Sequence, residues 1–101
     1  MTKRNLFLLG VLILAQLVYA GNWDDTKAQA KQENKLILLK FSGSDWCGPC
    51  IQLQKVIFDD PVFEQFAHEK LVLFKADFPR LKKNQLPKEQ QTINDQLAET
   101  Y

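Results

Sequence analysis

Two short apolar runs and several stretches with helical spacing organise the chain. Residues 36–41 and 71–77 are apolar with little alternation, which is typical of strands buried on both faces of a sheet. Residues 26–35 are rich in Lys, Gln, Ala and Glu and predict a polar, peripheral helix. Asp24 and Asp25 stand just before it, where aspartates cap the first turn of a helix.

Three further helices are predicted from apolar residues spaced three and four apart. In residues 48–58, Cys50, Leu53 and Ile57 fall on one face, with Val56 beside it, whereas Gln52, Gln54 and Lys55 can face water. A short helix follows Asp60, with Pro61 at its first position, and residues 88–101 form the last helix. The buried stripes expected in these last two helices are Phe63, Phe66 and Ala67, and Ile93, Leu97 and Tyr101.

This order of elements predicts an α/β fold. Two buried strands joined through a helix favour a parallel pair with a right-handed crossover. Two strands alone make a poor sheet, because three or more are usually needed for independent stability. We therefore expect the 101 residues to hold an incomplete domain.

The first twenty residues have the features of a secretory signal peptide. Lys3 and Arg4 precede an apolar run over residues 6–18, and residues 18–20 suit signal peptidase. A membrane anchor is the alternative, but Gln16 interrupts the run, which falls short of the roughly 18 to 20 apolar residues that a bilayer crossing needs. We expect residues 1–20 to be a signal peptide that meets the membrane only during export, and residues 21–101 to be periplasmic or secreted.

The charge of the exported part narrows the choice of partner. Without Lys3 and Arg4, it holds 11 basic and 12 acidic side chains. This balance argues against nucleic acid or an anionic membrane as the main partner. The densest basic run, residues 80–83, is interpreted as a solvated connector. His68, the single histidine, lies on an amphipathic stretch and is expected at the surface.

The only two cysteines, Cys47 and Cys50, are candidates for redox chemistry. Outside the cytosol they will meet oxidants, and a disulfide between them would close too small a loop to be a strong staple. A helix beginning at Cys47 would lower the pKa of that thiol, so that Cys47 attacks a disulfide and Cys50 resolves the mixed disulfide. No bound cofactor is needed for this exchange with protein thiols and disulfides.

The neighbours of the two cysteines suit this role. Trp46 can cover the pair with a flat apolar surface, and Gly48 lets a partner backbone come close. Pro49 suits the first helical turn because its missing N–H costs nothing there.

A structural zinc site is not expected, because it needs four ligands, whereas two cysteines and His68 supply at most three. Two other interpretations of the cysteine pair stay open. Copper handling by the two thiolates remains an alternative. The other is a non-catalytic interaction module that binds a partner through exposed hydrophobic surface and leaves the cysteines idle.

Residues 46–50, WCGPC, closely resemble the thioredoxin active site. With Ser44, Asp45 and residues 58–63, the chain is similar to exported thioredoxin-like proteins related to the C-terminal domain of transmembrane disulfide reductases. This resemblance, over about residues 23–101, implies the thioredoxin fold and thiol-disulfide exchange. It also implies electron supply by a partner protein, with a membrane-bound disulfide reductase as the candidate.

The sequence departs from the family's pattern in three places. The buried aspartate of thioredoxins corresponds to Lys40 or Phe41, so proton transfer from Cys50 would use water or another group. The family's cis-proline loop and its C-terminal ββα portion are expected to be missing, which should lower activity and stability. The loop over residues 42–45 is longer than in thioredoxins.

Overall fold

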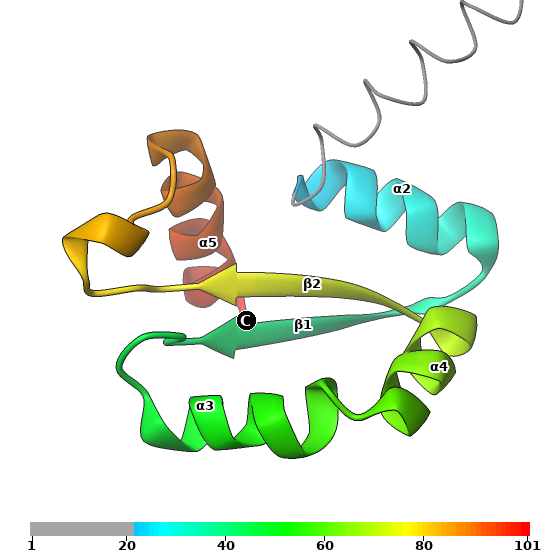
Figure 1. The fold of residues 1–101 in the computed structure, drawn as a ribbon. Coiled ribbons are helices and arrows are strands. Elements are labelled where there is room, and N and C mark those ends of the chain that lie inside the picture. Colours follow the sequence, from blue (N-terminus) through cyan, green and yellow to red (C-terminus); the bar gives the residue numbers. More distant parts are fainter. Residues whose placement is uncertain (1–21) are drawn as a thin grey trace, which may run out of the picture.

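The computed structural model describes residues 22–101 (Figure 1). The signal peptide predicted for residues 1–20 lies outside this part. The elements in chain order are helix α2 (Trp23–Glu33), strand β1 (Leu36–Ser42), helix α3 (Gly48–Leu53), the π-helical turn η1 (Gln54–Phe58), helix α4 (Pro61–Lys70), strand β2 (Leu71–Asp77), the 3₁₀ turn η2 (Lys82–Asn84) and helix α5 (Lys88–Thr100). None of the helices in residues 22–101 is long and apolar enough to cross a membrane.

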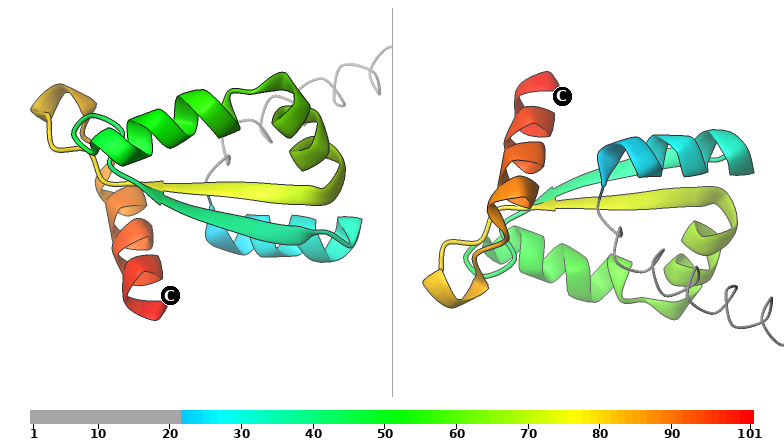
Figure 2. Two further views of the ribbon diagram at one scale, coloured as in Figure 1. Left: turned by 90° about the horizontal axis from the view of Figure 1, so that it is seen from below. Right: turned by 90° about the horizontal axis from the view of Figure 1, so that it is seen from above.

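The two strands pair in parallel, as the order of elements predicts. Leu36 lies opposite Leu71 and Ser42 lies opposite Asp77. Helices α2 and α5 lie on one face of this pair, and α3 and α4 lie on the other (Figure 2). The predicted α/β class is therefore confirmed, as helices on both sides of a parallel pair.

The core lies between the strands and the α2/α5 layer. Phe74, Ala76 and Leu97 are buried there. The Trp23 ring packs edge-on against Phe74, with 5.4 Å between ring centroids. The partly buried residues that complete this cluster are Trp23, Leu39, Phe78 and Ile93.

The prediction that both strands are buried on both faces is wrong. Strand β2 alternates between buried and exposed residues, and Leu73 is 50% exposed on the α3/α4 side. At the start of β1, Leu36 is 77% exposed. Part of the contact with the α3/α4 layer on this face is the polar pair Lys40 and Gln54.

Helix α3 begins at Gly48 as predicted, but its second half turns differently. After Leu53 the backbone winds into the π-helical turn, which ends as the Asp59 N–H donates to the Gln54 carbonyl at 2.8 Å. A π-turn places an extra residue in the helical ladder and rotates everything after it. Leu53, which precedes this turn, is 48% exposed and Ile57 within it is 40% exposed, whereas Gln54, expected in water, is half-buried.

The predicted helix caps are partly confirmed. Asp60 caps α4 by accepting the Val62 N–H at 2.8 Å, and Pro61 opens that helix as expected. The cap of α2 is Asn22, which accepts the N–H groups of the next two aspartates. Asp24 and Asp25 therefore lie in the first helical turn, where their charge complements the helix dipole.

The predicted apolar stripes of α4 and α5 are buried only in part. Ala67 is buried in α4, but Phe66 is 52% exposed. In α5, Leu97 is buried and Ile93 is half-buried, whereas Tyr101 is 73% exposed. These helices each pack against a two-stranded sheet, so only part of each stripe reaches it. His68 is exposed, as expected.

Candidate active site

The two cysteines form a disulfide at the start of α3. Their Cα atoms are 5.2 Å apart. Cys47 has extended backbone angles and is the N-cap of the helix, where its carbonyl accepts the Ile51 N–H at 3.0 Å. Its Sγ atom accepts the Cys50 N–H at 3.3 Å. Both cysteines are half-buried, so exposure alone does not distinguish them.

The spacer residues leave the pair open on one side. Pro49 lies in the first turn of α3, where an N–H would have no helical partner. Gly48 is exposed, and a Cβ atom at that position would meet nothing within 4 Å. The space beside the disulfide can therefore admit another polypeptide.

Trp46 is held against the segment that follows β2. Its indole N–H donates to the Phe78 carbonyl at 2.7 Å, and the Arg80 guanidinium lies 3.6 Å from the ring centroid. A Cβ atom on the buried Gly43 would stand 2.6 Å from the indole Cζ2, so only glycine leaves room for the ring. Trp46 is nevertheless 44% exposed and presents a flat apolar surface next to Cys47.

Asp45 connects the loop before α3 to the segment that follows β2. Its carboxylate accepts the N–H groups of Arg80 and Leu81 at 2.9 and 3.0 Å, and the Asn84 amide at 3.1 Å. The Arg80 N–H is the main reason why the pKa of Asp45 lies below its ordinary value. The charged carboxylate of Asp45 is therefore the form that stabilises the contact between the loop before α3 and the segment after β2.

A second set of hydrogen bonds joins the end of β1 and the loop after it to the end of β2. The Ser44 N–H donates to the Asp77 carboxylate at 2.9 Å, and the Ser44 hydroxyl bonds the same group. The Phe78 N–H donates to the Ser42 carbonyl at 2.8 Å. Residues 42–45, the loop whose length departs from the family's pattern, thus bind directly to residues 77–84.

The sequence reasoning missed Asp45, Asp77 and Arg80 as parts of the site. A signal for them was present, since both aspartates lie at or soon after the end of a strand. The carboxyl ends of parallel strands meet at one edge of a sheet, so polar side chains there come together. The predicted residues Trp46, Cys47, Gly48, Pro49 and Cys50 all lie at this edge.

Two residues, Lys40 and Phe41, are candidates for the position of the buried aspartate of thioredoxins. Of these two, Lys40 faces the helical segment of α3 and η1. Its Nζ bonds the Gln54 side chain and lies 4.0 Å from the centre of the Phe58 ring. Burial, and next the charge of Lys75, lower the pKa of Lys40. Phe41 instead contacts Phe78, with 6.4 Å between ring centroids.

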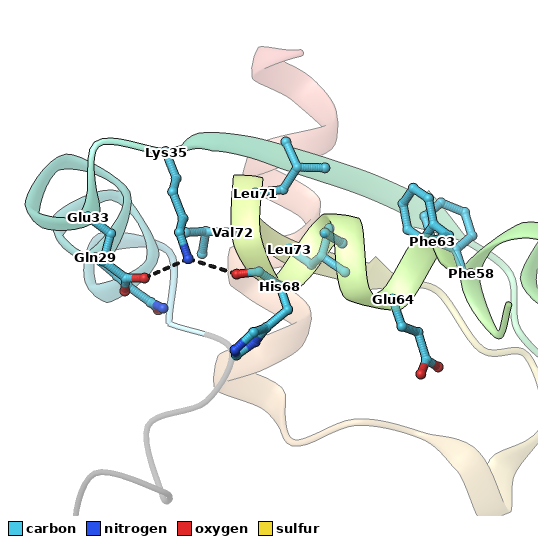
Figure 3. A pocket seen from close by; sticks show the side chains of 11 residues that line it. Gln29, Glu33, Lys35, Phe58, Phe63, Glu64, His68, Leu71, Val72 and Leu73 are labelled. Atoms are coloured by element: carbon cyan, nitrogen blue, oxygen red, sulfur yellow. Dashed lines mark hydrogen bonds and ion pairs between the residues drawn. The ribbon is translucent and has the colours of Figure 1, made fainter. Parts of the chain in front are cut away.

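A separate hollow of about 350 Å³ lies at the opposite end of the sheet, between α2, α4 and the start of β2 (Figure 3). Lys35 crosses it, pairing with Glu33 at 2.9 Å and donating to the His68 carbonyl at 2.8 Å (Figure 3). Hydrogen bonding from Lys35 is the main cause that lowers the pKa of Glu33. This hollow contains neither cysteine. In residues 22–101 no three His, Cys, Asp or Glu side chains group in a way that could hold a metal ion.

Comparison with protein families identifies the architecture. A family model described as thioredoxin-like matches residues 18–97. The chain belongs to the thioredoxin-like family. A thioredoxin-like solved structure, a DsbH oxidoreductase, superposes with a TM-score of 0.72 at 38% identity, covering 79% of this chain and 54% of that one. The two strands and their flanking helices are thus part of a thioredoxin fold.

Two curated relatives come from Chlamydia pneumoniae. The disulfide bond reductase DsbH is 42% identical over 72 residues, which make up 71% of this chain and 42% of that protein. The thioredoxin-related protein DsbJ is 27% identical over 62 residues, covering 61% of this chain and 18% of the relative. The chain therefore spans less than half the length of either relative.

Proposed function

We propose that this protein is a thiol-disulfide oxidoreductase in which Cys47 is the nucleophile and Cys50 the resolving thiol. The observation that carries the proposal is the position of the Cys47 sulfur at the helix N-cap, where it accepts the Cys50 N–H. Such a hydrogen bond and the helix dipole favour a thiolate over a thiol. A thiolate is the reactive form in disulfide exchange.

The exchange proceeds in two balanced steps. The Cys47 thiolate attacks one sulfur of a substrate disulfide, forms a mixed disulfide, and releases the other substrate sulfur as a thiolate. Cys50 then loses its proton and attacks the Cys47 sulfur, which releases the second substrate thiolate and leaves the Cys47–Cys50 disulfide. The substrate gains two electrons and the cysteine pair loses two. In reverse, the pair oxidises a protein dithiol.

The residues around the pair have supporting roles. Gly48 leaves space for the substrate backbone, Pro49 fits the first turn, and Trp46 offers an apolar surface for the substrate. In the reduced protein the proton of Cys50 passes to water or to another group, because Lys40 stands in β1 where thioredoxins have a carboxylic acid.

The biological setting extends this proposal. The expected signal peptide at residues 1–20 implies a periplasmic or secreted protein. Its partners would be protein thiols and disulfides, and a membrane-bound disulfide reductase would supply a dithiol for re-reduction. The relative named disulfide bond reductase supports the reducing direction.

A non-catalytic interaction module is the second candidate. It is favoured by large apolar side chains exposed on the α3/α4 side, among them Val62 at 78% and Phe66 at 52%. In this interpretation the cysteines take no part in function. Catalytic turnover of a disulfide substrate therefore distinguishes the two candidates.

The test is disulfide reduction by the purified protein with a dithiol reductant. Wild-type protein should accelerate reduction of a protein disulfide above the reductant alone. Cys47→Ser should remove the acceleration, and Cys50→Ser should stop it after the mixed disulfide. Acceleration that survives Cys47→Ser would exclude the enzyme proposal, and Ser44→Ala serves as a control that changes the loop without changing a thiol.

A further inference from the structure

Three exposed cations belong to a segment at the same end of the sheet as the cysteine pair. Arg80, Lys82 and Lys83 belong to the segment after β2, here called the basic turn (residues 80–83), and each is exposed. This segment and the start of α3 lie at the same end of the sheet in both views (Figures 1 and 2). The run interpreted from sequence as a solvated connector is thus a neighbour of the active site.

The basic turn is fixed to the active-site loop. Asp45 holds its backbone through the N–H groups of Arg80 and Leu81, and through the Asn84 side chain. The Arg80 guanidinium stacks on Trp46, the residue directly before Cys47. The Arg80 guanidinium therefore has a defined place beside Trp46, and the backbone that carries Lys82 and Lys83 is anchored to the same loop.

The charge of these cations is available to a partner. The ion pairs within residues 22–101 are Lys27 with Asp24 and Lys35 with Glu33, and neither includes the basic turn. The two carboxylates at this end of the sheet, Asp45 and Asp77, accept hydrogen bonds from loop N–H, hydroxyl and amide groups. Both carboxylates are half-buried, whereas the three cations face solvent.

We infer that the basic turn binds an acidic segment next to the cystine or dithiol of a partner protein. The inference rests on the proposed function, because the disulfide exchange at Cys47 brings a polypeptide to this place. Oriented charges next to a binding site raise the association rate of oppositely charged partners. A lipid surface fits less well, because the exported part holds 11 basic and 12 acidic side chains, and the segment that carries the cations is bound to the loop of the cysteine pair.

The test uses three cystine peptides that differ only at residues flanking the disulfide, which are acidic, neutral or basic. Reduced protein is mixed with each peptide in a single turnover. The acidic peptide should react about five to ten times faster than the basic one at low salt. At 1 M salt, where the screening length is about 3 Å, the rates should converge.

Charge reversal assigns the preference to the basic turn. Lys82→Glu with Lys83→Glu should remove or reverse the preference and leave the rate with the neutral peptide unchanged. Lys31→Glu with Lys70→Glu makes the same charge change with exposed lysines at the other end of the sheet and should preserve it. If the glutamate variant does not fold, Lys82→Gln with Lys83→Gln should still reduce the preference.

The outcomes separate the inference from the proposed function. If no peptide is reduced, the proposed function fails. If all three peptides are reduced at equal rates, the function stands and the inference is overturned. Equal rates together with binding of the protein to vesicles of an anionic phospholipid would assign the cations to a lipid surface, which also overturns it.

Discussion

At the level of single residues, Asp45 lies two positions before Cys47, and both of its carboxylate oxygens accept hydrogen bonds from the segment after β2. Trp46, the next residue, makes a hydrogen bond and a cation–π contact to the same segment. Hydrogen bonds to a carboxylate are among the stronger ones in proteins. The position of the redox pair therefore depends on residues 30 or more positions away in the chain.

Removing the Asp45 carboxylate should destabilise the protein in a pH-dependent way. The pKa of Asp45 is lowered in the folded state, chiefly by the Arg80 N–H, so its contribution is present above the ordinary value of 3.8 and is lost as the pH falls through the lower folded pKa. In urea denaturation, wild type should be more stable than Asp45→Ala at pH 6, and this difference should shrink as the pH falls below 3.8 toward the lower folded pKa. Asp95→Ala, at an exposed position of α5, is the control. A pH-independent difference would contradict this role.

The cysteine site could be predicted from sequence because its signal is local. Cys47, Gly48, Pro49 and Cys50 are adjacent, and a short spacer at a helix start suffices to indicate their chemistry. The roles of Asp45 and Arg80 depend on a contact across 35 positions, whose partners the spacing of apolar residues does not specify. Only the rule that parallel strands end at the same edge of a sheet could have indicated that Asp45 and Arg80 lie close together.

At the level of elements, the register of α3 against the sheet departs most from the sequence expectation. Gln54, the first residue of the π-helical turn, bonds Lys40, and Leu53 just before it faces outward. Regular helical spacing could not predict the positions after this turn, because a single inserted residue changes every later position. The strands were predicted in the right places since their apolar runs are continuous, but their exposure follows from how few residues α3 and α4 bring to that face.

The Lys40 contact should give a recognisable alkaline pH dependence. Burial and the neighbouring Lys75 lower the pKa of Lys40 from 10.5 in the folded state. Between that lowered pKa and 10.5 the unfolded chain binds more protons, so the free energy of unfolding should rise with pH. Lys40→Met should remove this rise in the disulfide form, and Lys75→Met should reduce it.

The measurement is urea denaturation at pH 8 and pH 10. Lys55→Met, which removes an exposed lysine from the π-helical turn, is the matched control. A rise that persists undiminished in Lys40→Met would show that another group produces it.

At the level of the whole molecule, stability comes from one face of a two-stranded sheet. Phe74, Ala76 and Leu97 form the buried centre, and the opposite face leaves Leu73 half exposed. The disulfide spans only three positions of the chain. Because stabilisation by a disulfide grows with the length of the loop that it closes, this one should contribute little to the fold.

Reduction of the disulfide should therefore cost less stability than a change in the core. We expect reduction to lower the free energy of unfolding by at most about 2 kcal/mol. Leu97→Ala should lower it by about 2 to 4 kcal/mol, because it removes buried methyl groups and leaves a cavity. Chemical denaturation of oxidised and reduced protein compares the two. Unfolding on reduction would mean that the cysteines are a structural staple.

Trapping of the mixed disulfide tests most directly the claim that Cys47 is the attacking thiol. Reduced Cys50→Ala and Cys47→Ala proteins are each mixed with a neutral cystine peptide, and mass spectrometry follows the adduct over time. Cys50→Ala should form a stable adduct on Cys47 at least about ten times faster than Cys47→Ala forms one on Cys50. Equal rates, or faster capture by Cys50, would contradict the account.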